Sequence, residues 1–251
     1  MMIEIIYILC LRQLKHYWRS KARLIGSLGQ PLLFMVVFGF GFGPLYTKAS
    51  EGANYIDFLA PGIITMAILF TAVFSGLEII WDRKFGFLKE TLVAPISRTE
   101  IMIGKTFGGA TIAMIQGLIM LSMTYLFGFR IPNLGSLWMG LIFMFLIAIF
   151  FSGLGLTIAS KMEDMQGFQM ILNFLLMPIY FLSGALFPLQ NLPDSIYLIS
   201  RLDPLTYGVD GLRGSLGGVS TFGIYNDLLA IGSLSVLICA IGTVFFLKIE
   251  A

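Results

Sequence analysis

The stretch FLAPGIITMAILFTAVFSGL, residues 58–77, decides the fold class because it runs for twenty uncharged residues between Asp57 and Glu78. A helix of about twenty apolar residues crosses the hydrocarbon core of a bilayer. The chain as a whole has the same character, with 57% hydrophobic and only 12% charged residues in 251, whereas soluble domains carry about 25% charged residues. We therefore predict an all-α, multi-pass membrane protein.

Six runs of this kind occur, and each predicts one transmembrane helix because a charge near the bilayer centre costs about 2.5–3.5 kcal/mol. The predicted spans are about 24–47, 58–81, 101–129, 134–160, 165–187 and 228–247. Twelve of the sixteen Lys and Arg residues then fall on one side, in the two terminal segments and around the connections after the second and fourth spans. Since cytoplasmic segments are enriched in Lys and Arg, we predict that both termini are cytoplasmic and that the protein lies in the cell (plasma or inner) membrane.

Residues 1–23 separate apolar from basic side chains at helical spacing and predict an amphipathic interfacial helix. It would lie on the cytoplasmic membrane surface, in contact with membrane lipids, and lead into the first span as a collar. Ordinary anchoring by basic residues is the alternative interpretation. The residues that define the two faces are Tyr7, Leu11, Arg12, Lys15, Trp18 and Arg19.

The connection between the last two spans, 188–227, is rich in Gly, Asp and Pro, yet parts of it stay apolar. A solvated loop would be more polar. We predict short re-entrant helices that enter the outer leaflet, which backbone chemistry permits where protein or water surrounds them.

Between the second and third spans, residues 82–94 predict a short, separate amphipathic helix. Phe85, Leu88 and Leu92 share one face, and Ala94 precedes Pro95, which disfavours continuation of the helix. Ser97 and Glu100 have the spacing of a capping box that starts the next helix. The apolar face of the short helix needs a partner, either lipid or another protein.

Three motifs resemble the type-2 ABC transporter permeases, and the similarity is greatest to the daunorubicin-resistance and nodulation-factor exporter branch. They are GFLKE at 86–90, APISR at 94–98 and RLDPLTYGVDGLR at 201–213. The resemblance extends over essentially the whole chain, which it identifies as a single ABC-2-type transmembrane domain, 1–251.

The resemblance implies that the helix at 82–94 is a coupling helix, which inserts into a cleft of a separate ATP-hydrolysing subunit. The residues implied in coupling are Phe85, Phe87, Leu88, Lys89, Glu90 and Leu92. Four charged residues would lie at the inner mouth, where Glu78 and Asp82 are expected to pair with Arg83, Lys84 or N-terminal basic residues. The corresponding outer motif contributes Pro204, Tyr207, Asp210 and Arg213.

No cofactor is expected in this chain, and ATP and Mg would belong to the partner ATPase. The tripeptide Gly104-Lys105-Thr106 is not a P-loop, because that motif needs a glycine where Thr99 stands. The only histidine, His16, cannot supply a metalloprotease HExxH pair. We therefore expect that the chain is not an enzyme by itself, and no nucleic-acid partner is expected.

The resemblance further implies a homodimer, or a heterodimer with a similar permease, with the pathway between the two halves along spans 1, 2 and 5. Scarce mid-span charge favours a hydrophobic, amphipathic or lipid-linked substrate, such as a drug, lipid or glycan conjugate, moved outward. Two alternatives stay open. An ion-coupled secondary carrier would need ionisable residues at mid-depth, and a non-transport scaffold would use the helix at 82–94 only to dock a cytoplasmic partner.

Overall fold

The computed structural model describes residues 2–49, 54–87, 90, 96–132, 134–191 and 193–247. Within these ranges every regular element is a helix, as predicted. In chain order the elements are α1 (Met2–Arg19), α2 (Lys21–Ala49), α3 (Tyr55–Phe74), α4 (Leu77–Lys84), α6 (Arg98–Leu126), η1 (Leu134–Ser136), α7 (Leu137–Ser160), α8 (Met165–Leu182), η2 (Leu189–Asn191), α9 (Asp194–Leu202), α10 (Pro204–Gly217) and α11 (Ile224–Leu247).

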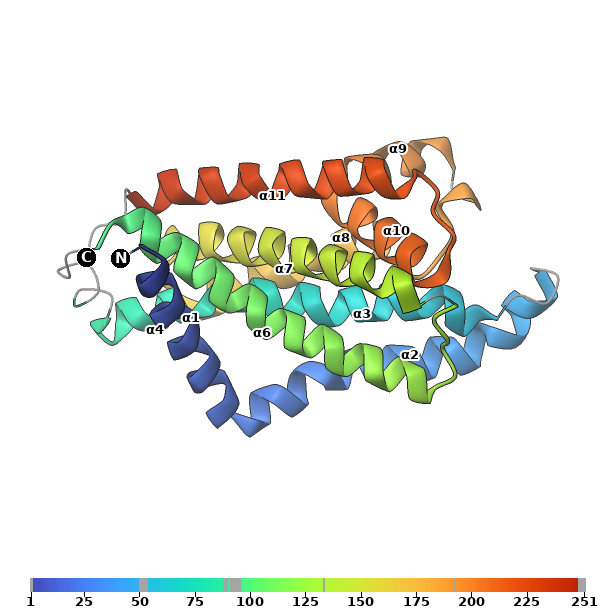
Figure 1. Ribbon diagram of the computed structural model, residues 1–251, viewed down its shortest axis with the longest axis horizontal. Coiled ribbons are helices and arrows are strands. Elements are labelled where there is room, and N and C mark those ends of the chain that lie inside the picture. Colours follow the sequence, from blue (N-terminus) through green and yellow to red (C-terminus); the bar gives the residue numbers. More distant parts are fainter. Residues whose placement is uncertain are drawn as a thin grey trace.

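Six helices in the described ranges are long and apolar enough to cross a membrane, by length and composition, which confirms the predicted number of spans. The second of these spans, Tyr55–Lys84, comprises α3 and α4 with a short turn between them. The six run along the long axis of the bundle, and the start of α1 lies at the same end as the close of α11 (Figure 1). An even number of spans requires this arrangement; which end is cytoplasmic remains a prediction.

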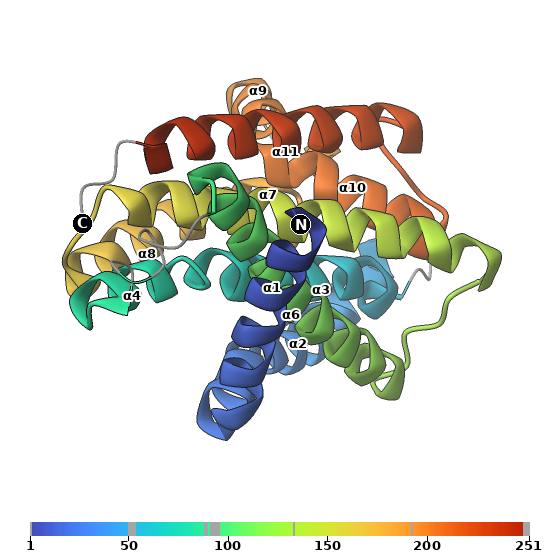
Figure 2. The same cartoon turned by 60° about the vertical axis from the view of Figure 1, so that its left-hand side comes forward.

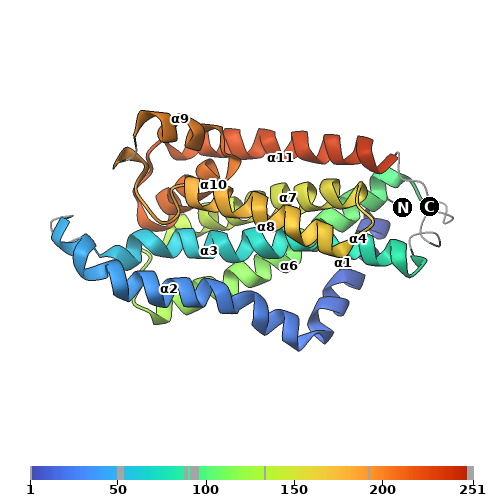
Figure 3. The same cartoon turned by 180° about the vertical axis from the view of Figure 1, so that it is seen from behind.

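The α3 helix occupies the centre of the bundle, with α2, α6 and α7 against it (Figures 1 and 3). In its membrane-length window 72% of the residues are buried. At the turn between α3 and α4, Gly155 of α7 lies against the backbone of Val73, and Gly76 lies against the backbone of Gly155. Small residues let helix backbones approach closely inside a membrane, so this contact fixes α7 against the second span.

Helix ends correct several predicted boundaries. Helix α6 begins at Arg98 under the predicted Ser97–Glu100 capping box and ends at Leu126 rather than 129. Helix α8 ends at Leu182 rather than 187, and a turn that contains Gly184 at φ +75° follows it. Residues 1–23 are not one helix, because the chain turns at Ser20 between α1 and α2.

Two short helices, α9 and α10, fill the connection before α11, at the end of the bundle opposite α4 (Figures 1 and 3). Most residues of α10 are buried, because this helix packs among α3, α7 and α11. Its Gly211 leaves room for the ring of Phe143 from α7. The predicted short helices are therefore present, while their depth in the outer leaflet remains a prediction.

The Gly155→Ala variant should be less stable than the wild type. A Cβ at this position would lie closer than 3.0 Å to backbone atoms of Val73, which cannot move aside as a flexible side chain can. Overpacking of a tight core typically costs about 1–3 kcal/mol. The thermal midpoint of the purified protein measures the effect.

Gly232→Ala on α11 is the matched control, because its Cβ would meet nothing within 4 Å. It should leave the midpoint unchanged or raise it slightly, since Ala is the better helix former. Equal midpoints for the two variants would contradict the close approach of α7 to the second span.

Candidate functional site

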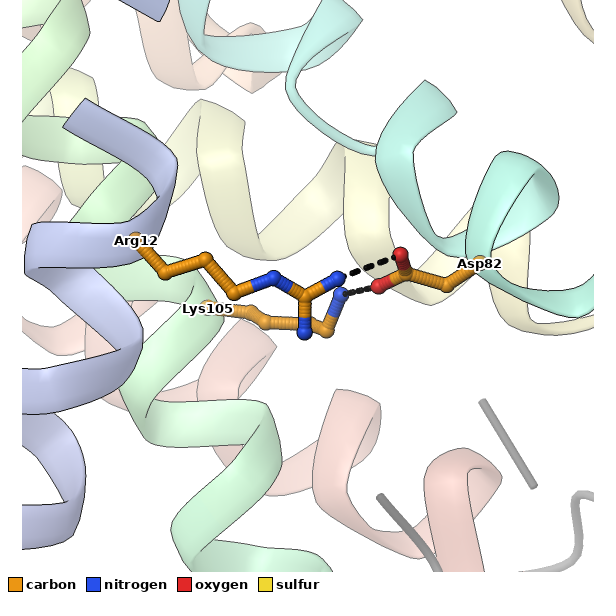
Figure 4. A network of polar contacts seen from close by, with 3 residues as sticks. All are labelled: Arg12, Asp82 and Lys105. Carbon is orange, nitrogen blue, oxygen red and sulfur yellow. Dashed lines mark hydrogen bonds and ion pairs between the residues drawn. The ribbon is translucent and has the colours of Figure 1, made fainter. Parts of the chain in front are cut away.

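The predicted mouth residues and the described coupling residues lie at one end of the bundle, near α1, α4 and the first turns of α6; we call it the α4 end. Helix α1 crosses in front of α6 there (Figure 2), and α4 is linked to both through the side chain of Asp82. At its centre, Asp82 of α4 accepts hydrogen bonds from two cations (Figure 4). Arg12 Nη2 of α1 lies 2.8 Å from Asp82 Oδ1, and Lys105 Nζ of α6 lies 2.5 Å from Asp82 Oδ2.

The two ion pairs of Asp82 differ in how deeply they are buried. Asp82 is 9% and Lys105 only 3% exposed, and a buried charge without a partner is strongly destabilising. The Arg12 side chain is 49% exposed, so its pairing with Asp82 is screened by solvent and contributes less. A basic partner for Asp82 from the N-terminal segment was expected; Lys105 was not singled out as one.

Arg83, the next residue of α4, bonds to the end of α7, on the other side of α4 from the partners of Asp82. Its Nη2 donates to the carbonyl of Ser160 at 2.9 Å and its Nη1 to that of Met162 at 3.2 Å, where α7 ends. Trp81 donates its indole N–H to Met165 Sδ of α8 at 2.8 Å. Consecutive residues thus join α4 to α1 and α6 on one side and to α7 and α8 on the other.

Lys84, the last residue of α4, is exposed. The side chains of Phe85 and Phe87 are 66% and 51% exposed, and Gly86 between them has φ +82°. The prediction of one helix over 82–94 is therefore wrong at its start, because residues 82–84 form the last turn of α4 and Gly86 interrupts the helix. Glu90 is helical and exposed, whereas Leu88, Lys89 and Leu92 lie outside the described residues.

Two cavities adjoin this cluster, and Glu78 lines both. One, of about 570 Å³, lies between α1 and α4, with Trp81, Phe85 and the Asp82 cluster in its wall. The other, of about 440 Å³, is lined mainly from α2, α3 and α4, with single residues from α1, α6 and α8, so it also touches the third span. The second cavity therefore borders spans 1, 2 and 5, along which the pathway was predicted.

Helix α1 packs on α6 through a face that the sequence analysis did not identify. Gly104 and Gly108 of α6 give room to Leu9 and Gln13 of α1. Tyr17 is buried, while Tyr7 and Trp18 of the predicted apolar face are 64% and 65% exposed. Leu11 is half-buried, and Lys15 and Arg19 are exposed. The predicted face is thus the side of α1 that points away from the protein.

Gln116 of α6 holds the turn between α1 and α2. Its amide group donates to the Tyr17 hydroxyl, to the Ser27 hydroxyl at 2.7 Å and to the Leu24 carbonyl at 3.2 Å. These acceptors lie on both sides of Ser20. A glutamine within the uncharged run of the third span was the sequence signal that could have identified this contact.

The predicted outer motif lies at the opposite, α10 end and joins elements there. Pro204 is the first residue of α10, where its missing N–H costs nothing. The Tyr207 hydroxyl donates to the Arg201 carbonyl at 2.7 Å, and Asp210 accepts from the N–H groups of Thr221 and Phe222. These contacts fix α10 against α9 and against the segment that leads into α11.

Arg213 joins α10 to α3 and to the turn after α8. Its Nη2 donates to the Gly184 carbonyl at 2.9 Å, and its guanidinium lies 3.9 Å from the centre of the Phe58 ring. Burial lowers the pKa of Arg213 to about 10, which the nearby Asp210 partly opposes. Arg213 therefore remains a cation at neutral pH.

The chain is similar in sequence to known transport permeases. The sequence profile of the ABC-2 type transporter family matches residues 4–216. Transport permease ycf38 of Cyanophora paradoxa is 31% identical over 84% of this chain and 73% of that protein. Nodulation protein J of Sinorhizobium fredii is 25% identical over 81% of this chain and 80% of its own length. The inner membrane transport permease YadH of Escherichia coli is 26% identical, over 80% and 81%.

Replacement of Asp82 by Asn should lower stability by about 3–5 kcal/mol, because it leaves Lys105 as a buried charge without its carboxylate. Arg12→Gln, which removes the half-exposed partner, should cost less than about 1 kcal/mol. The midpoints of thermal unfolding in detergent give the order of stability of these variants. The double variant Asp82→Asn/Lys105→Met should recover most of the loss; if it is no better than Asp82→Asn, Lys105 is not the dominant partner.

Asp203, the N-cap of α10, should make stability fall as pH rises. One of its oxygens accepts from the Leu205 N–H at 2.9 Å, and the other is buried with no hydrogen-bond partner among the described residues. Burial raises the pKa of Asp203 from 3.8 to about 7, against the lowering effect of the Leu205 hydrogen bond. The folded protein thus holds a proton that the unfolded chain has lost, so stability decreases between about pH 4 and pH 7.

Asp203→Asn keeps an N-cap acceptor and should remove this part of the pH dependence, measured as the melting temperature from about pH 4 to pH 8. Asp194→Asn, at an exposed acid on α9, is the control and should retain the wild-type slope. A wild-type slope in Asp203→Asn would show that Asp203 is not the titrating group.

Proposed function

Because the chain belongs to the ABC-2 type transporter family, whose permease subunits normally work with an ATPase subunit, we propose that it is the permease of an ATP-driven exporter. The segment that starts at Asp82 is its contact with that ATPase. Members of the family are transport permease subunits and not enzymes themselves. ATP and Mg²⁺ belong to the partner.

The observation that carries the proposal is the double attachment of α4. Asp82 joins α4 to α1 and α6, and Arg83 joins it to the end of α7. The exposed rings of Phe85 and Phe87 follow directly. A cytoplasmic subunit that binds these rings therefore displaces α4, which is attached to α1, α6, α7 and, through Trp81, α8.

The same geometry supports a mechanism. ATP binding closes the ATPase pair and displaces the segment after α4. Because α4 continues the second span and borders the 440 Å³ cavity through Leu77, Glu78 and Trp81, its displacement changes the shape of that cavity. The cavity opens toward the opposite membrane face and releases its cargo outward.

Assembly and orientation complete the proposal. Both termini lie in the cytoplasm of a cell or inner membrane, and two such permeases, identical or similar, face each other across the pathway. Only 22% of the residues in the membrane-length windows of α2 and α8, and 17% in that of α11, are buried within the chain. Of these three helices, α2 and α8 border the 440 Å³ cavity, so the second permease is placed against these two. The cavity that they border mixes aromatic rings with hydroxyl and amide groups, which suits an amphipathic or lipid-linked cargo.

The variant Phe85→Ser/Phe87→Ser should lose the ATPase subunit. Both rings are exposed at the α4 end, and apolar anchors that insert into a partner typically carry most of the binding energy. Native purification of the tagged chain from its own membranes in mild detergent measures the co-purified ATPase. We expect at least a tenfold loss from the variant.

Tyr225→Ser, which removes a ring that is 79% exposed at the far end of the bundle, is the control and should retain the ATPase. If no ATPase accompanies the wild type, the permease proposal fails, and a carrier or a scaffold becomes the better hypothesis. If an ATPase is present but stays with the double variant, the contact lies elsewhere on the chain.

A further inference from the structure

A groove of about 320 Å³ lies at the junction of α1 and α6. Four of its lining residues are on α1 and one is on α6. They are Leu14, Lys15, Trp18, Arg19 and Ile115. The two cations are four residues apart, so they project from the same face of α1, one turn from each other.

The cations of α1 divide into two classes. Arg12 is paired with Asp82. Lys15 and Arg19 are exposed and make no ion pair with any residue that the structure describes. No acidic residue lines the groove. The groove therefore presents two available positive charges beside an indole ring that is 65% exposed.

The rest of the groove is apolar and continues along α6. Ile115 forms its floor, and Leu118 and Leu126 follow on the same face of α6, 40% and 78% exposed. This face runs away from the α4 end, along the membrane-length part of α6. A ligand that fills the groove thus needs an anionic head and a long apolar tail.

We propose that this groove binds one anionic phospholipid. The phosphate lies between Lys15 and Arg19, the headgroup side of the lipid rests on Trp18, and an acyl chain follows Ile115 and Leu118 along α6. Arginine and lysine are the side chains that recognise phosphate, and tryptophan is enriched at the headgroup level of membranes. A free phosphate would leave the apolar wall uncovered, and the wall lies within the membrane-length stretch of α6, which suits a lipid.

The bound lipid would hold α1 on α6 from the outside, as Gln116 holds the turn from the inside. This site is separate from the contact with an ATPase, because the groove shares no lining residue with the cavity beside the Asp82 cluster. The proposal therefore stands or falls independently of the transport function.

Native mass spectrometry of the full chain tests the site, with phosphatidylglycerol and phosphatidylcholine of the same acyl chains as probes. The wild type should retain one phosphatidylglycerol in preference to phosphatidylcholine. Each basic residue near an anionic lipid changes affinity roughly fivefold. Lys15→Gln/Arg19→Gln should therefore weaken phosphatidylglycerol binding by about 25-fold, while Lys15→Arg/Arg19→Lys should retain it.

Lys21→Gln distinguishes a site from general attraction to a charged surface. Lys21 is an exposed cation at the start of α2, close in sequence to the groove but not part of its lining. Its loss should leave phosphatidylglycerol retention unchanged, and inorganic phosphate should not displace the lipid. Brominated phosphatidylglycerol should quench the fluorescence of the wild type more strongly than that of Trp18→Phe.

Three results would overturn the proposal. They are equal retention of the two lipids, equal weakening by Lys21→Gln and by the double variant, and displacement by inorganic phosphate. Because Lys15 and Arg19 are exposed, the variants should elute from gel filtration as the wild type does. Should they not, the quenching comparison between the wild type and Trp18→Phe decides the question.

Discussion

The ammonium group of Lys105 and the carboxylate of Asp82 impose the main constraint on the α4 end. Neither charge is stable in a buried position without the other, so α4 must end where α6 presents its lysine. Arg12 then reaches the remaining carboxylate oxygen from α1. With Arg83 on the carbonyls at the end of α7, one turn of helix determines how α1, α6 and α7 are placed.

A second set of polar contacts fixes the path into the first span. Gln116 bonds to acceptors on both sides of the turn at Ser20, and Gly104 and Gly108 let α1 approach α6 closely. Burial of an amide side chain within an apolar helix costs free energy unless the amide forms hydrogen bonds. Helix α1 is therefore packed into the bundle on one face and exposed on the other, which is the face predicted to lie at the membrane interface.

The sequence predicted the features that depend on local composition and spacing. Six uncharged runs became six membrane-length helices, and Ser97 with Glu100 formed the expected capping box. The sequence did not identify Lys105 as a partner of Asp82, because the carboxylate that pairs with this buried lysine comes from another helix. The periodicity of residues 1–23 identified the apolar face of α1 but not its packed face, where Leu9 and Gln13 meet glycines and Tyr17 meets Gln116. Such contacts depend on which helices become neighbours, and no local pattern records that.

The glycine after α4 has a mechanical consequence. A continuous helix would transmit both torque and thrust from a bound subunit into the second span. At Gly86 the backbone passes through a left-handed conformation at φ +82°, which glycine adopts without strain, and the last backbone hydrogen bond of α4 closes there on the Arg83 carbonyl. We expect Gly86 to act as a swivel. A force along the axis of α4 is transmitted to α4, whereas rotation of the following segment is taken up at Gly86 and does not separate the residues of the Asp82 cluster.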